Sequence, residues 1–226
     1  MNVINKLTMS KRHDPDFVGR RNFLKRATFV GAAVVAPGLA TNAQRPSKNP
    51  VTQTPDELSA DEVRNLLKLE PHATCGFVRV TFMSKERIAP GGLPAPFAAG
   101  RPVGSALYFM VTPGAPVRLH RIRNDQLYHY YLGDPLEVLM LRVDGTTERV
   151  VVGPDLRGGQ LVQLLIPGNT FHTARVIGRR RWFLGASTEW PGVEPVDVEI
   201  GDVDALAAKY PQVADDLRTF PVPAKE

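Results

Sequence analysis

Short runs of alternating hydrophobic and polar residues dominate the chain from Gly76 onward. Apolar side chains recur at every second position in these runs, which is the period of a half-buried β-strand, and Gly, Pro, Asn or Asp separates one run from the next. The runs are FVRVTFM, SALYFMV, QLYHYYL, PLEVLMLRV, TERVVV, QLVQLLI and RWFLGAS. Asp144-Gly145 between two of them predicts a tight hairpin. This pattern of many short strands predicts an all-β sandwich or barrel.

Helical signals flank this β-rich region. Ser59 and Glu62 form a capping box, and the apolar stripe that follows them ends before Pro71. A second helix is predicted from about residue 203 to 220, with an interruption near Pro211. We therefore expect one short helix before the strands and one helical segment after them.

The segment 84–104, between two of the predicted strands, is rich in Gly and Pro and has no apolar period. Loops of this length in a compact domain are commonly functional. We expect this segment to form a lid or a rim over a binding site.

The first 43 residues have the composition of an export signal. Arg20 and Arg21 precede an uncharged stretch at 27–43 that ends in small residues, as in a twin-arginine signal peptide. A membrane anchor is the alternative, but Pro37 and several glycines interrupt a stretch that is short for a span. We predict export by the twin-arginine route to the periplasm or the medium, with no stable membrane anchor after cleavage.

The rest of the chain is predicted to contain a polar linker (44–56), a single domain (57–220) and a short tail (221–226). One domain is expected because 226 residues suffice for one sizeable core but are few for two. The net charge of +5 resides entirely in residues 1–43, so the remainder is neutral and gives no support for a nucleic-acid partner. The single cysteine, Cys75, excludes an internal disulfide.

Two histidines lie in spaced motifs that resemble those of the cupin superfamily. The first motif is a glycine, a histidine, an acid and a glycine, and its positions here are Gly114, His120, Gln126 and Gly133. The second is a proline followed five positions later by a histidine, here Pro167 and His172. The resemblance rests on both motifs together, in the correct order and on a β-rich chain.

The chain resembles the cupin-5 subfamily more closely, over roughly residues 57 to 220. Further matching segments are LEPH at 69–72, GFVR at 76–79, GDPLE at 133–137 and GPDL at 153–156. This resemblance implies an all-β double-stranded β-helix, the cupin jelly roll, with a short N-terminal helix and a C-terminal helix. It also implies a homodimer, and it leaves the biochemical activity undefined.

The metal ligands of the superfamily are only partly present. A metal-binding cupin usually offers two histidines two positions apart, a glutamate, and a histidine from the second motif. Ile122 stands at the second histidine position and Gln126 at the acid, so the remaining candidate ligands are His120, Gln126 and His172. A neutral amide supplies no charge to offset desolvation of a cation. A bound divalent transition metal is therefore an alternative rather than the leading hypothesis.

The candidate site residues fall into two groups. We predict that the imidazoles of His120 and His172 converge in one cavity, where either is a candidate general base, and that Tyr128 donates a proton. The predicted ligand-binding side chains are His72, Arg79, Gln126 and Gln163. Arg79 on an apolar strand favours a carboxylate partner, although a buried ion pair would explain it equally well. Either histidine could instead satisfy a backbone carbonyl.

Three functions are compatible with these residues. The first is an exported protein that binds a small carbohydrate-like or sugar-acid ligand in its barrel, as an enzyme of the isomerase, epimerase or lyase type. The second is a divalent-metal-dependent cupin enzyme. The third is a non-catalytic periplasmic binding module, because a fold does not determine a function.

Overall fold

A computed structural model describes residues 58–220 of the chain. The predicted signal peptide, the linker and the tail at 221–226 lie outside the described residues. Between residues 58 and 220, no helix has the length and apolar character needed to cross a membrane.

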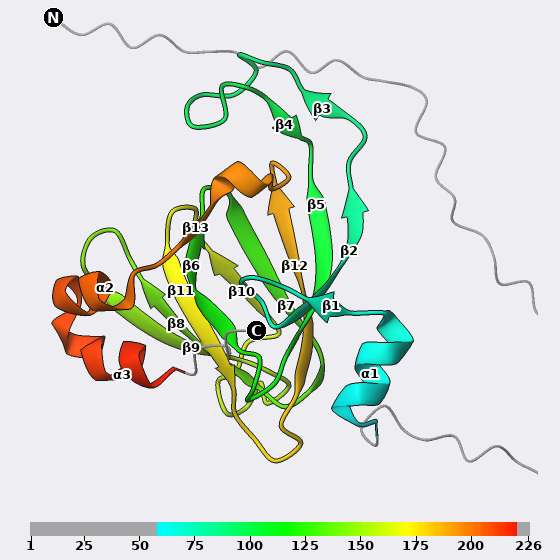
Figure 1. Cartoon of the computed structure of the whole chain (residues 1–226), viewed down its shortest axis with the longest axis vertical. Coiled ribbons are helices and arrows are strands. Elements are labelled where there is room, and N and C mark those ends of the chain that lie inside the picture. The colour runs from blue at the N-terminus through cyan, green and yellow to red at the C-terminus, as the bar shows by residue number, and fades with distance from the viewer. Residues whose placement is uncertain (1–57, 221–226) are drawn as a thin grey trace, which may run out of the picture. The chain divides into compact units, whose positions relative to one another are not determined.

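Two antiparallel sheets face each other and form the body of the described region (Figure 1). The first sheet contains, in spatial order, β1 (Glu70–Pro71), β2 (Phe77–Met83), β5 (Ser105–Val111), β12 (Phe183–Trp190), β7 (Asp125–Gly133) and β10 (Gln163–Ile166). The second contains β13 (Val198–Ile200), β6 (Val117–Ile122), β11 (Phe171–Val176), β8 (Leu136–Leu141) and β9 (Thr147–Val152). This is the all-β jelly roll that the resemblance implied.

The main core lies between the two sheets, because alternate side chains of each strand point inward. Fully buried residues of both sheets meet there, among them Phe109 and Phe183 from the first sheet and Leu136 and Val138 from the second. The ring centroids of Phe109 and Phe183 are 5.4 Å apart. This packing fills one end of the barrel.

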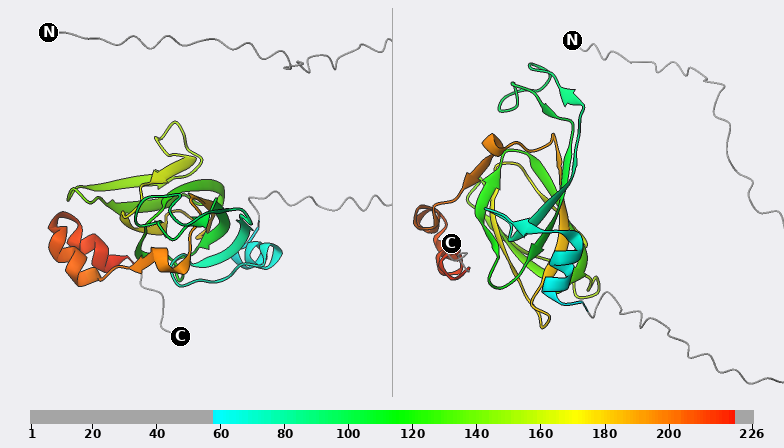
Figure 2. Two further views of the ribbon diagram at one scale, coloured as in Figure 1. Left: turned by 90° about the horizontal axis from the view of Figure 1, so that it is seen from above. Right: turned by 45° about the vertical axis from the view of Figure 1, so that its right-hand side comes forward.

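The helices cover the outer faces of the two sheets on opposite sides of the barrel (Figure 2). They are α1 (Ala60–Leu67) on one side and α2 (Val203–Lys209), η3 (Pro211–Val213) and α3 (Ala214–Thr219) on the other, whereas η2 (Pro195–Asp197) lies at the end of the barrel near β3 and β4 (Figure 1). Val63 of α1 packs with Met110 and Leu184 of the first sheet, and Leu206 packs with Leu139 of the second. The helix α1 and the C-terminal helices therefore cover apolar residues on the outer faces of the two sheets.

The predicted helix boundaries are confirmed. The Ser59 side chain caps the backbone of Glu62, whose carboxylate bonds back to the Ser59 backbone. The helix ends at Lys68, whose φ of 54° is left-handed. Pro211 separates α2 from the helical turns that follow, as expected for a residue without a backbone donor.

The seven predicted strand runs all contain strands, but two central strands lie outside them. These are β6 and β11, which carry His120 and His172. Charged residues interrupt the apolar period of both strands, as in VRLHRI and FHTARV. The two central strands that the sequence pattern did not predict are thus those that contain the motif histidines.

The segment 84–104 forms an arm that extends beyond one end of the barrel (Figure 1). It contains the short pair β3 (Arg87–Ile88) and β4 (Arg101–Pro102). The Arg101 guanidinium donates two hydrogen bonds to the Asp197 carboxylate, at 2.8 and 2.9 Å. Both side chains are almost fully buried, so the arm is attached to η2 by a buried ion pair.

Candidate functional site

A cavity of about 510 Å³ lies between the sheets, on the side of the barrel from which the arm extends. Aliphatic side chains of β2, β5, β6 and β13 form most of its wall. Its polar groups include Ser105, His120, Gln126, Ser187 and Glu189. This volume is in the range of small-molecule sites, and a mostly apolar wall with a few polar groups is typical of them.

A row of polar residues crosses the inner face of the first sheet. Glu189 of β12 lies directly opposite Ser105 of β5 on one side and Gln126 of β7 on the other. Ser187, two positions before Glu189, points to the same face. Each serine hydroxyl donates a 2.5 Å hydrogen bond to one carboxylate oxygen of Glu189.

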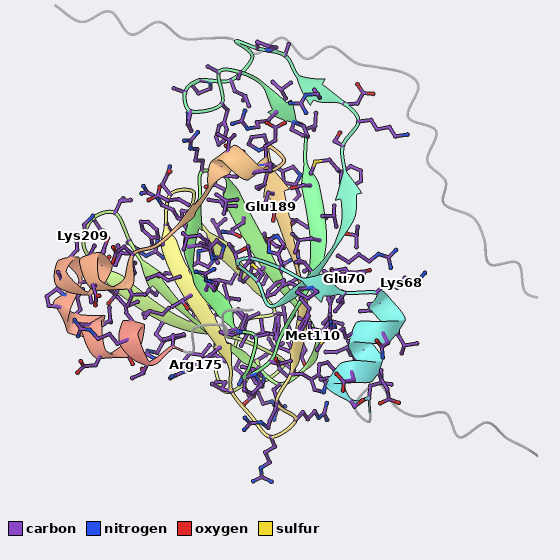
Figure 3. The ribbon with its side chains drawn as sticks, in the orientation of Figure 1. Lys68, Glu70, Met110, Arg175, Glu189 and Lys209 are labelled. Atoms are coloured by element: carbon purple, nitrogen blue, oxygen red, sulfur yellow. The ribbon has the colours of Figure 1, made fainter. Side chains whose placement is uncertain are left out.

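Glu189 is the buried acid of the cavity. Only 3% of the residue is exposed, and Figure 3 places it in the half of the barrel nearest the arm. Burial raises the pKa of the Glu189 carboxyl, and the hydrogen bonds from Ser105 and Ser187 partly oppose that shift. Among residues 58–220, no Lys or Arg lines this cavity. Glu189 is therefore held by hydroxyl groups without a cationic partner.

His120 and His172 lie side by side, but the prediction that both face one cavity is met only for His120. They are direct partners on the adjacent strands β6 and β11, and their ring centroids are 4.3 Å apart. His120 lines the cavity and His172, with no exposed surface, does not. The two imidazoles therefore have different access to a ligand.

The hydrogen bonds of His120 define which ring nitrogen is available. The Arg118 carbonyl lies 2.8 Å from Nδ1, so Nδ1 carries the proton and Nε2 keeps its lone pair. Burial lowers the pKa of His120 to about 4, and the hydrogen bond to the Arg118 carbonyl only partly opposes that shift. The imidazole is therefore neutral at physiological pH and acts as an acceptor.

Both ring nitrogens of His172 are engaged. Nδ1 donates to the Thr170 carbonyl at 3.2 Å, and Nε2 accepts from the Tyr128 hydroxyl at 3.1 Å. Burial lowers the pKa of His172 and raises the pKa of Tyr128 well beyond their ordinary values. Tyr128 and His172 form a closed neutral pair that does not line the cavity. They support the site from behind its wall.

His72, Thr74 and Cys75 form another part of the cavity wall. The backbone N–H and the hydroxyl of Thr74 lie 3.3 and 3.2 Å from His72 Nδ1. Burial lowers the pKa of His72 and raises the pKa of the Cys75 thiol to about 11. His72 and Gln126 are thus the predicted ligand-binding residues that the structure brings to the cavity.

Arg79 and Gln163 lie elsewhere. The exposed Arg79 side chain donates to the Leu67 carbonyl at 3.2 Å, and the exposed Gln163 amide contacts His129 Nδ1 at 3.0 Å. Neither residue lines the cavity. The alternation within β2 explains Arg79, because Val78 and Val80 occupy the inward positions beside it. The expected carboxylate-binding arginine is therefore not part of this site.

The donor set does not fit a resident transition metal. His172 has no free ring nitrogen, and Gln126 offers a neutral amide that approaches the Ser187 hydroxyl at 3.5 Å. Within the described part of the chain, no group of three or more His, Cys, Asp or Glu side chains is placed to hold a metal ion. The predicted metal ligands His120, Gln126 and His172 therefore do not form a fitting donor set.

Sequence reasoning missed Glu189, Ser187 and Ser105 as site residues. The predicted run RWFLGAS stops at Ser187, whereas β12 continues to Trp190. The alternation would have found Glu189, because it follows Phe183 and Ser187 on the inward face of the same strand. A carboxylate at an inward strand position requires a partner or a function.

The described residues form a small jelly-roll domain with a ligand-sized site between its sheets. The family model Cupin_5, cupin superfamily (DUF985), matches residues 61–201, and the chain belongs to this family. A hypothetical protein from Leishmania major is 25% identical with a TM-score of 0.66, and the match covers 72% of this chain and 98% of that one.

Two further solved structures are similar. A protein from Shewanella oneidensis is 25% identical with a TM-score of 0.63, over 74% of this chain and 99% of that one. A cupin 2 domain-containing protein from Halorhodospira halophila is 19% identical with a TM-score of 0.41, over 65% and 83% of the two chains. No curated protein matches the sequence.

Proposed function

We propose that this protein binds a small organic molecule between its sheets and catalyses proton transfer on it, as an isomerase, epimerase or lyase. The observation that carries the proposal is the pair His120 and Glu189. These residues line one cavity from the two opposing sheets. A ligand bound between them has a proton acceptor on one side and a buried carboxylate on the other.

The two groups have different tasks in this proposal. His120 Nε2 accepts a proton from the ligand, and the hydrogen bond from Nδ1 to the Arg118 carbonyl holds the ring in the required tautomer. Glu189, fixed by two serine hydroxyls, binds a hydrogen-bond donor of the ligand and orients it. Because a neutral imidazole with a pKa of about 4 is a weak base, the proton it removes is an acidified one, such as that on a carbon beside a carbonyl.

The residues that line the cavity favour fewer classes of ligand than the sequence left open. A sugar acid would bring a second anion next to Glu189, and no Lys or Arg lining the cavity between residues 58 and 220 would neutralise it. The aliphatic wall favours a ligand with an apolar portion. We therefore place the ligand among uncharged or cationic molecules rather than sugar acids.

Proton exchange with solvent tests the catalytic part of the proposal. Three- to six-carbon hydroxy- and amino-carbonyl compounds are incubated with the protein in D₂O, and loss of the α-proton signal is followed by ¹H NMR. We expect at least one compound to exchange faster with the wild type, and the His120→Ala variant to lose on the order of 10²-fold of that rate. A compound that binds in the cavity with no exchange would favour the non-catalytic binding module.

Export by the twin-arginine route belongs to the same proposal and is supported by Arg20, Arg21 and the uncharged stretch after them. Its test is cell fractionation of the full chain. We expect the wild type outside the cytoplasm and the Arg20→Lys, Arg21→Lys double variant inside it. Equal distribution of the two proteins would contradict export by this route.

A further inference from the structure

The buried Glu189 carboxylate lacks a counter-charge in the described protein. Asp197, another buried acid, pairs with Arg101. The ordinary cost of burying a charge is avoided by pairing it or by neutralising it. The hydrogen bonds around Glu189 indicate which of these two solutions applies.

The two serines favour an ionised carboxylate at Glu189. Ser105 Oγ accepts the backbone N–H of Val193 at 3.2 Å and donates its own proton to one carboxylate oxygen of Glu189. Ser187 Oγ donates to the other carboxylate oxygen at the same 2.5 Å distance. Hydroxyl groups that donate to a carboxyl group lower its pKa and so favour the ionised form. Both oxygens of Glu189 thus accept, as an ionised carboxylate does.

The remaining polar groups near Glu189 do not supply a cation. His120 is neutral and presents a lone pair at Nε2. Glu194 also lines the cavity, but it pairs with Arg87 and Arg101 on the arm at 2.7 and 3.6 Å. The cavity therefore combines an unpaired buried anion, a second acceptor and an aliphatic wall.

We infer that the cavity binds a small primary or secondary amine in its protonated form, with the ammonium group on Glu189 and the hydrocarbon part against the aliphatic wall. This inference rests on the proposed function for the location of the site, and it names the class of ligand. An ammonium group supplies the missing charge and hydrogen-bond donors for Glu189, whereas the hydroxyl of an alcohol supplies one donor and no charge. A carboxylate ligand would repel Glu189.

Three probes of nearly equal shape separate these ligand classes: cyclohexylamine, cyclohexanol and cyclohexanecarboxylate. Their affinities for the full chain are measured by isothermal titration at pH 7.5. We expect the amine to bind at least about tenfold more tightly than the alcohol, and the carboxylate to bind weakest. Equal or tighter binding of the alcohol or the carboxylate, or no binding of the amine at millimolar concentration, would overturn the inference.

Two matched variants assign the effect to one carboxylate. Glu189→Gln keeps the shape of the side chain and removes its charge, so the amine affinity is expected to fall by about tenfold or more while the alcohol affinity changes little. Glu194→Gln removes a carboxylate of the same cavity that already has cationic partners, so its effect on the amine is expected to stay within about twofold. Circular dichroism confirms that both variants are folded. An unchanged amine affinity in Glu189→Gln would refute the assignment.

The outcome of this binding test is separable from that of the proton-exchange test. Amine binding that depends on Glu189, without any exchange, would retain the ligand class and remove the catalytic proposal. Exchange of an uncharged compound that depends on His120, without amine binding, would retain the catalytic proposal and remove the ligand class.

Discussion

The Arg101→Met variant is expected to lose about 3 kcal/mol of unfolding free energy, because the substitution leaves the Asp197 carboxylate buried without its partner. The side chains of Arg101 and Asp197 are 5% and 0% exposed. The value lies at the lower end for breaking a buried ion pair because the arm is peripheral to the barrel core. Urea denaturation followed by circular dichroism measures the change.

Arg87→Met is the matched control for Arg101→Met. Arg87 lies on the same arm and pairs with Glu194, but its side chain is 53% exposed, so its loss is expected to cost less than about 1 kcal/mol. Adding Asp197→Leu to Arg101→Met removes the orphaned charge and is expected to recover part of the lost stability. Equal losses of unfolding free energy for the two arginine substitutions would contradict a larger contribution of the buried ion pair.

Acidification from pH 7 to pH 5 is expected to destabilise the protein by about 2 kcal/mol through His120 alone. The pKa of His120 is about 4 in the folded protein and about 6.5 in the unfolded chain, so the unfolded chain binds more protons in this interval. The stabilisation is fully present above pH 6.5 and is lost as the pH falls. His172 acts in the same direction, whereas the raised pKa of Glu189 opposes them.

The measurement is a series of denaturant titrations between pH 7 and pH 5. The carboxyls whose pKa is lowered by ion pairs, Glu137 and Asp197, stay ionised in both states over most of this range. His120→Gln is expected to reduce the slope with pH, while His72→Gln, which removes a less buried imidazole whose pKa is also lowered, is expected to reduce it less. A wild-type stability that does not change over this range would contradict buried neutral imidazoles.

The sequence determined the fold more fully than the site. The β-branched and aromatic composition of runs such as SALYFMV and TERVVV, together with the turn residues that bound them, identified β5 and β9 to the residue. The capping box at Ser59 located the start of α1 in the same way. Local sequence patterns predicted these boundaries because turn residues and helix caps act through neighbouring residues.

The site depended on relations that a single sequence contains only indirectly. The motif spacing located His120, but the closed pair of His172 and Tyr128 follows from register and burial, which bring Nε2 and the hydroxyl together. Arg79 was assigned to the ligand because alternation does not say which of its two faces is the inner one. Glu189 was missed because the strand that carries it was ended too early.

The protonated state of Cys75 bears on how this protein tolerates oxidants. With a pKa of about 11, only about one in ten thousand molecules carries a thiolate at pH 7, and the thiolate is the form that reacts with peroxides and disulfides. The sulfur is also buried. A chain with one such thiol has little tendency to form mixed disulfides, and redox chemistry in its surroundings leaves the wall of the ligand cavity unmodified.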